Sequence, residues 1–202
     1  MHSISEPSAN PEEQSGGAVP AGEPVSPEEA EAIARAIVLR QLTMAARTRQ
    51  QLRTTLLKRE VTPDIAERVL DRMEAVGLVN DEAYATDYVA QRRASRGSGR
   101  RALAQELSRK GIAPELIEQS LADIESQDER ALATDLVRRK WRRVAGLESR
   151  ARRRRLASML GRRGYPPGLV FEVIREVEAE EGQEQSDAAD YSAIVDTGSD
   201  DD

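Results

Sequence analysis

A pattern of leucines, a turn residue and a proline occurs three times along this chain, at spacings of 51 and then 53 residues. The middle copy comprises Leu103, Leu107, Gly111, Pro114 and Leu121. The first copy comprises Leu52, Leu56, Glu60, Pro63 and Leu70, and the third comprises Leu156, Leu160, Gly164, Pro167 and Ile174. Units of this length bury a continuous core only by stacking on their neighbours, and the stack presents a long surface. We therefore expect an elongated molecule that binds a large partner.

The residues around each copy predict three helices per unit. First helices begin near Ser26, Asn80 and Asp128, where a polar side chain can cap the helix and carboxylates follow in the first turn. Second helices begin near Thr48, Ser98 and Ser149, and third helices open with the repeated proline. Sustained alternation of apolar and polar residues is missing. The fold class is therefore all-α, with three tandem three-helix repeats and about nine helices.

Acidic residues are concentrated at the two ends of the chain. Residues 1–27 and 181–202 hold twelve of the 36 Asp and Glu residues and no Lys or Arg, although the whole chain has a net charge of -6. Both ends are poor in large apolar residues, so we expect disordered tails. The repeats then occupy 28–79, 80–127 and 128–180, and this body carries 30 basic against 24 acidic residues.

Composition argues against catalysis and against a bound cofactor. The chain has no cysteine, its single histidine is His2, and it has no glycine-rich phosphate loop. We expect neither an enzyme nor a metal site. The sequence also has no apolar stretch of membrane-spanning length, so we expect a soluble, cytoplasmic protein that does not contact a membrane.

Positive charge is the strongest functional signal, and it gathers in two segments. The first segment contains Arg92, Arg93, Arg96, Arg100 and Arg101. The second contains Arg138, Arg139, Lys140, Arg142, Arg143, Arg150, Arg152, Arg153, Arg154 and Arg155, followed by Arg162 and Arg163, with Glu148 as the only acid between 138 and 163. Such runs attract polyanions or acidic protein surfaces. We expect these cations to share one continuous flank of the array.

Two other interpretations of these segments are less favoured. A helix-turn-helix motif over Leu107 to Leu121 would place the helix after Pro114 in a DNA groove, but that helix carries acids and no basic residue. Trp141 is the one aromatic residue inside a basic segment, whereas single-strand stacking surfaces use several. We expect Trp141 to anchor an interface between units.

The junction of the first and second units resembles a known family. The chain reads Gly77-Leu78-Val79-Asn80-Asp81-Glu82-Ala83-Tyr84-Ala85, then Arg92, Arg93, Gly97, and Lys110-Gly111-Ile112. This is similar to the signature of the RecX family, which regulates the RecA recombinase. In the third unit, Leu160-Gly161-Arg162-Arg163-Gly164-Tyr165 resembles the closing repeat of that family. The resemblance covers roughly residues 28–178, but Glu60 and the acidic end from 181 depart from the family pattern.

The resemblance implies a curved helical protein that lies in the groove of a RecA filament on single-stranded DNA. There it would restrain the recombinase, ATPase and coprotease activities of RecA. Our first hypothesis is thus a negative regulator of RecA, a monomer that contacts the filament and its single-stranded DNA. The expected contact surface consists of the first basic segment, Arg92 to Arg101, and the part of the second from Arg138 to Arg155. The alternatives are an independent, nonspecific DNA-binding module and a helical adaptor for another acidic protein.

Overall fold

The structure is a computed structural model that describes residues 26–196, apart from the side chains of 126 and 184–196. These residues form helices and connecting turns, and no strand is found among them. The helices are α1 (Pro27–Met44), α2 (Arg49–Leu57), α3 (Pro63–Ala75), α4 (Asp81–Arg96), α5 (Arg100–Arg109), α6 (Pro114–Ala122), α7 (Ser126–Trp141), α8 (Ser149–Arg162) and α9 (Pro167–Asp196). The predicted all-α class is confirmed. The expected N-terminal tail lies outside the described residues, except for 26 and 27.

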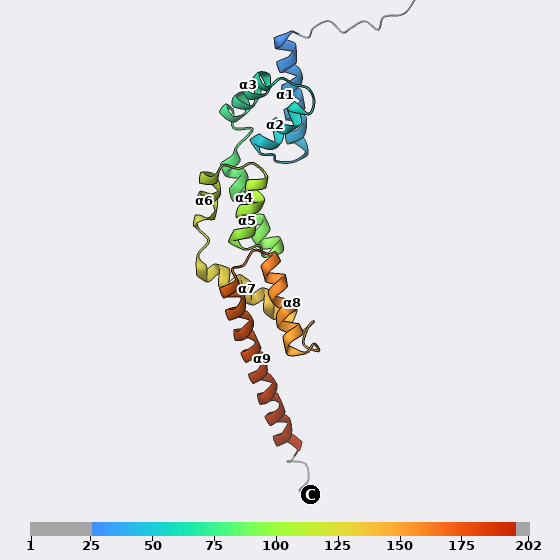
Figure 1. Cartoon of the computed structure of the whole chain (residues 1–202), viewed down its shortest axis with the longest axis vertical. Helices are drawn as coiled ribbons and strands as arrows, with labels where there is room; N and C mark the ends of the chain where they lie inside the picture. Colours follow the sequence, from blue (N-terminus) through green and yellow to red (C-terminus); the bar gives the residue numbers. More distant parts are fainter. Residues whose placement is uncertain (1–25, 197–202) are drawn as a thin grey trace, which may run out of the picture.

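The helices form three bundles that follow one another along the long axis of the molecule (Figure 1). Each bundle has its own core, which its three consecutive helices enclose. Leu52 and Leu56, Leu103 and Leu107, and Leu156 and Leu160 are at most 1% exposed and contribute to the three cores. The repeated leucines therefore bury the α2, α5 and α8 helices in equivalent ways.

Side-chain caps mark the starts of α1 and α4, whereas α7 has no side-chain cap hydrogen bond. Ser26 Oγ accepts a hydrogen bond from the Glu29 amide at 3.2 Å, and Asn80 Oδ1 accepts one from the Ala83 amide at 2.8 Å. These contacts satisfy amides that have no partner inside the helix. Helix starts predicted from the sequence agree with the structure to within two residues.

The second helix of each unit ends at a residue with positive φ. Gly111 and Gly164 have φ values of 81° and 84°, and Glu60 has 62° at the corresponding place in the first unit. Glycine adopts this left-handed conformation at little cost, whereas a residue with a Cβ is strained there by about 1–2 kcal/mol. The backbone shape is thus the same in all three units, although the first unit forms it with a less suitable residue.

Successive units meet through a set of contacts that occurs twice. At the first junction, Thr48 Oγ1 donates a hydrogen bond to the Lys110 carbonyl at 2.6 Å, and Asp81 Oδ1 accepts one from the Arg49 amide at 2.9 Å. The start of α2 therefore docks on the end of α5 and the start of α4.

The second junction repeats this geometry one unit further along the chain. The Gly99 amide donates to the Arg163 carbonyl at 2.7 Å, and Glu129 Oε1 accepts from the Arg100 amide at 2.8 Å. The start of α5 docks on the end of α8 and the start of α7. A helix start that meets a carboxylate from the next unit is thus the joining element of the whole array.

Close approach at the junctions explains why two of the three turn residues are glycines. A Cβ on Gly111 would lie 2.3 Å from Gln50 Cβ, and a Cβ on Gly164 would lie 2.3 Å from the Ala102 amide nitrogen. Glu60 is in the first unit, which no described unit precedes, and it is exposed. The departure from glycine at this position therefore has a structural reason.

The last helix extends past residue 180, where the expected third repeat ends. α9 continues to Asp196, so 181–196 is helical where the analysis placed the beginning of a disordered tail; 197–202 lie outside the described residues. Ala, Glu and Gln favour helices, and this stretch has no proline. Extending a helix that is already formed costs far less than starting one. Acidic composition alone therefore placed the end of the helix too early.

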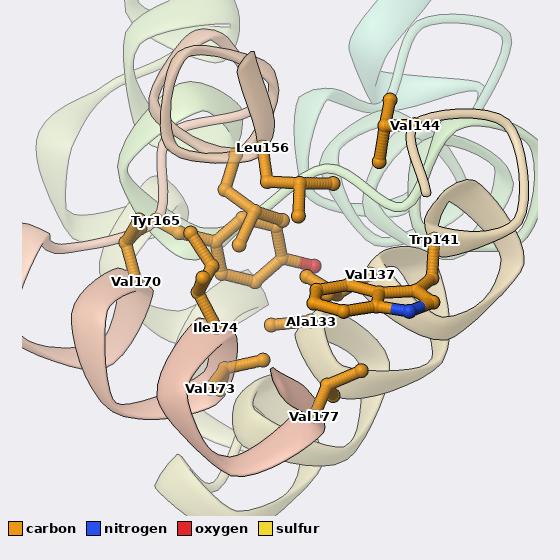
Figure 2. Close-up of a cluster of buried hydrophobic side chains, with 11 residues drawn as sticks. Ala133, Val137, Trp141, Val144, Leu156, Tyr165, Val170, Val173, Ile174 and Val177 are labelled. Atoms are coloured by element: carbon orange, nitrogen blue, oxygen red, sulfur yellow. The ribbon is translucent and has the colours of Figure 1, made fainter. Parts of the chain in front are cut away.

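Trp141 occupies a different position from the one that we expected. It is 2% exposed and belongs to the core of the third unit together with Val137, Tyr165 and Val177 (Figure 2). The Arg152 guanidinium lies 4.6 Å from the centre of the indole ring. The expectation that Trp141 lies at an interface between units is therefore wrong. Its large indole ring packs in the core of the third bundle instead.

Candidate functional site

Arginines from the second and third units converge in a cleft at their junction. The cleft has a volume of about 390 Å³, and its lining includes Arg93 and Arg96 at the end of α4, Arg139 on α7, and Arg162 and Arg163 at the end of α8. The sequence places these residues up to 70 positions apart, and the docking of the units brings them together. We call these five side chains the junction arginines.

Among the junction arginines, Arg139 pairs with Asp135, and the other four form no ion pair with a described residue. Glu106 is the one carboxylate on the described lining, and it accepts a hydrogen bond from the Tyr88 hydroxyl and lies 3.4 Å from Arg92 Nε. Burial, followed by this hydrogen bond, raises the pKa of Tyr88 above its ordinary value. Since Glu106 is already engaged, the cleft retains positive charge that can attract a polyanion.

Contacts across the junction hold the cleft in shape. Arg163 Nε donates to the Arg96 carbonyl at 2.9 Å, and the buried Tyr165 hydroxyl donates to the Gly97 carbonyl at 3.1 Å. Burial is the main reason that the pKa of Tyr165 rises to about 12. A phenol that stays protonated keeps this hydrogen bond throughout the ordinary pH range. The ends of α4 and α8 are also where helix dipoles favour cations.

Some expected contact residues of the second unit have structural partners. Arg92 lies over the Tyr88 ring at 4.9 Å, and Arg100 Nη1 donates to the Leu121 carbonyl at 2.7 Å. Arg100 therefore fastens α5 to the end of α6. Arg101 is exposed and lines a second hollow of about 670 Å³, on which Arg162 also borders.

In the third unit, carboxylates of α9 hold several of the expected contact arginines. Arg138 pairs with Glu180 at 2.8 Å, and Arg153 pairs with Glu178 at 2.6 Å. Arg152 lies 3.7 Å from the same Glu178. The excess charge counted between 138 and 163 is thus partly neutralised, because the partners come from a distant part of the sequence.

The remaining cations of the second basic segment do not reach the junction together. Arg142 and Arg143 lie between α7 and α8, whereas Lys140 belongs to the last turn of α7; Arg150, Arg154 and Arg155 are on α8. Because a helix rises 1.5 Å per residue, Arg150 is about 18 Å along α8 from Arg162. The ends of α8 lie far apart in Figure 1. These cations therefore do not line the junction cleft, and one continuous flank stays a prediction.

Arg162 and Arg163 belong to the cleft but were absent from the contact residues that the sequence analysis selected. The available signal was the alignment of the repeats, which places Arg163 opposite Lys110 and hence at a junction between units. Arg162 and Arg163 lie outside the densest run of arginines. Their position in the sequence therefore did not suggest that they meet Arg93 and Arg96.

The described part of the chain has neither a metal-binding cluster nor a helix suited to a membrane. Within it, no group of three or more His, Cys, Asp or Glu side chains is placed to hold a metal ion. Of the helices described, none has both the length and the apolarity needed to cross a membrane.

Family models match all three units of the chain. The RecX models for the first, second and third three-helix domains match residues 34–73, 80–121 and 127–174. Together these matches extend from α1 into α9.

Similar full sequences carry the name regulatory protein RecX. The protein from Streptomyces coelicolor is 46% identical over 157 residues, which are 78% of this chain and 84% of that protein. The protein from Thermobifida fusca is 42% identical over 82% of this chain and 89% of its own length. The protein from Mycobacterium ulcerans is 48% identical over 70% of this chain and 82% of its own length.

Two solved structures share the fold. The crystal structure of RecX from Lactobacillus salivarius superposes with a TM-score of 0.67 and 19% identity, over 75% of this chain and 99% of that chain. A crystal structure of a regulatory protein RecX gives a TM-score of 0.65 and 24% identity, over 74% and 73% of the two chains. At these identities the likeness concerns the fold alone.

Proposed function

The chain belongs to the RecX family of regulatory proteins, and from this premise we propose that it is a negative regulator of the RecA recombinase. It binds the RecA filament on single-stranded DNA, along the groove of the filament, and restrains recombination, ATP hydrolysis and coprotease activity. It acts in the cytoplasm as a monomer and regulates without catalysis of its own.

The junction cleft is the observation that best supports this proposal. Five arginines from three helices line it, and its one described carboxylate is engaged by Tyr88 and Arg92. A filament on single-stranded DNA is long and contains the phosphates of that strand, so an elongated array with a basic cleft complements it in shape and charge. The contact surface proposed from the sequence is thus narrowed to the junction arginines and the neighbouring Arg101.

ATP hydrolysis by RecA on single-stranded DNA tests the proposal. We expect the chain, at a small molar fraction of RecA, to suppress hydrolysis. The variant Arg96→Glu/Arg162→Glu should need at least ten times more protein for the same suppression, since it reverses two charges of the cleft. Arg100 is unsuitable for this purpose because its side chain fastens α5 to α6.

A matched control reverses two charges far from the cleft. Arg40 and Arg72 are exposed residues of the first unit and form no ion pair within the described residues. Arg40→Glu/Arg72→Glu changes the net charge by the same amount and should suppress hydrolysis as the unaltered chain does. Hydrolysis that stays unchanged at saturating amounts of the unaltered chain would reject the proposed function.

An independent nucleic-acid-binding module is the second candidate, because the same cleft can hold the phosphates of free DNA. It predicts an affinity for single-stranded DNA that falls steeply with salt in the absence of RecA. It further predicts that RecA hydrolysis drops only at concentrations at which the chain covers the DNA. A helical adaptor for another acidic protein would produce neither effect.

A further inference from the structure

A hollow between α8 and α9 of the third unit contains an exposed aromatic ring. Its volume is about 560 Å³, and its lining includes Ala157, Phe171 and Ile174 together with Arg154 and Arg175. Phe171 is the only phenylalanine of the chain and is 69% exposed. Aromatic rings next to arginines are frequent among the residues that dominate the binding energy of protein interfaces.

The corresponding place in the first unit is filled by ion pairs. The repeat pattern aligns Ala157 with Arg53, and Phe171 with Glu67. In the first unit, Arg53 Nε pairs with Glu67 Oε1 at 2.6 Å, which joins α2 to α3 across their surface. Arg49 adds a pair with the same Glu67, also at 2.6 Å.

The third unit keeps one pair of this network and loses the others. Its Arg153–Glu178 pair corresponds to the pair of Arg49 with Glu74 in the first unit. Ala157 and Phe171 cannot form an ion pair, and Arg175 stands where the first unit has Asp71. The hollow therefore does not follow from the three-helix fold as such. It results from replacing an ion-pair network by an apolar, positively charged surface.

The charges around the hollow indicate the chemistry of its occupant. Glu172 pairs with Arg130 at 2.8 Å, and Glu178 is held by Arg153. Arg154 and Arg175 form no ion pair with any described residue, so two cations remain for a ligand. Two carboxylates lie on the lining of the hollow, whereas the junction cleft has one, so the rim of the hollow carries charges of both signs. A mixed rim around an apolar centre is typical of protein interfaces.

We propose that this hollow binds the RecA protomer, through a segment that presents a bulky apolar side chain beside a carboxylate. Phe171 packs against the apolar side chain, and Arg154 and Arg175 attract the carboxylate. This assignment rests on the proposed function. It gives the chain two distinct surfaces that contact the filament. The junction arginines contact the polyanionic part, and the α8–α9 hollow contacts protein.

Truncation of the exposed ring in the full chain tests the assignment. Phe171→Ala should weaken binding to RecA filaments on oligo(dT) by about 30-fold, the loss expected for a side chain that dominates an interface. Binding to oligo(dT) alone, followed by fluorescence anisotropy, should change less than twofold. Because Phe171 is exposed, the midpoint of thermal unfolding should stay the same, and Phe171→Leu should recover part of the binding.

Met44→Ala is the matched control, since Met44 is 79% exposed on α1 and distant from the hollow along the chain. It should leave both affinities unchanged. If Phe171→Ala binds filaments as well as the unaltered chain does, the assignment is overturned while the proposed function stands. If Phe171→Ala loses affinity for oligo(dT) alone, the hollow is a base-stacking surface and the assignment is also overturned. If the unaltered chain fails to bind filaments, the assignment and the proposed function are both rejected.

Discussion

Gly111 and Gly164 meet two constraints at once. Each has a positive φ, and each lies where a Cβ would collide with the preceding unit. Gly77 also has a positive φ, of 73°, but a Cβ on it would meet nothing within 4 Å. Comparison of Gly77 with Gly164 therefore separates the cost of the backbone conformation from the cost of the docking contact.

We expect Gly164→Ala to destabilise the chain by about 2–4 kcal/mol, the sum of the left-handed conformation and an overpacked junction. Gly77→Ala should cost only about 1 kcal/mol, for the conformation alone. Urea unfolding followed by circular dichroism measures both. Equal losses for the two variants would show that the junction does not require the close approach.

Substitution of Glu60 by glycine should have the opposite effect on stability. Since it adopts a φ of 62° with no described unit packed against it, Glu60→Gly should raise the free energy of unfolding by about 0.5–1 kcal/mol. The midpoint of urea unfolding should move upward accordingly. A decrease would mean that the Glu60 side chain forms a stabilising contact that outweighs its strain.

The start of α5 depends on a capping side chain from the next unit more than the start of α2 does. Thr48 caps α2 with its own side chain, and Gln51 bonds back to the Thr48 amide. The N-cap of α5 is Gly99, which has no side chain, so the Glu129 carboxylate from the third unit serves the start of that helix. A cap from the neighbouring unit thus replaces a local one.

This difference in capping predicts that Glu129→Ala destabilises the fold more than Asp81→Ala does. Glu129→Ala should destabilise by about 1–2 kcal/mol, the range observed when a helix loses its cap. Asp81→Ala removes the bond to the Arg49 amide, but α2 keeps Thr48, so about 0.5–1 kcal/mol is expected. Urea unfolding of the two variants under the same conditions gives the comparison. A larger loss for Asp81→Ala would contradict this account of the junctions.

The contact between α2 and α3 predicts a dependence on pH. Hydrogen bonds from Arg53 and Arg49 hold the pKa of Glu67 below its ordinary value in the folded chain. A carboxyl with a depressed pKa stabilises the fold above its unfolded pKa, and this stabilisation is lost as the pH falls through the folded value. We therefore expect the midpoint of urea unfolding to decrease when the pH is lowered below about 4.3. Glu67→Gln should lower the midpoint at neutral pH and flatten the acid decline, and an equally steep decline would contradict the assignment.

At the scale of the whole molecule, the sequence predicts the architecture well. The repeated leucines, prolines and turn residues define three units, and their helical spacing defines the helices, because both signals are local. The RecX family was also recognisable from the residues at the first junction. These features need no knowledge of how the units are placed relative to one another.

The site was less predictable because it depends on contacts between distant parts of the chain. Arg138 and Arg153 looked like free cations until α9 supplied Glu180 and Glu178 as partners. Arg162 joined Arg96 only through the docking of two units. Trp141 entered a core because its neighbours in the sequence say little about its neighbours in space. A count of charges along the sequence does not determine which of them remain available.

Co-sedimentation with RecA filaments on single-stranded DNA tests most directly whether the cleft between the second and third units holds the filament. The unaltered chain and Arg40→Glu/Arg72→Glu should sediment with filaments to the same extent at a fixed ionic strength, and Arg96→Glu/Arg162→Glu should stay largely in the supernatant. Naked single-stranded DNA in parallel reports how much of the binding is due to nucleic acid alone. If the cleft variant sediments with filaments as fully as the unaltered chain does, the cleft is not the contact surface.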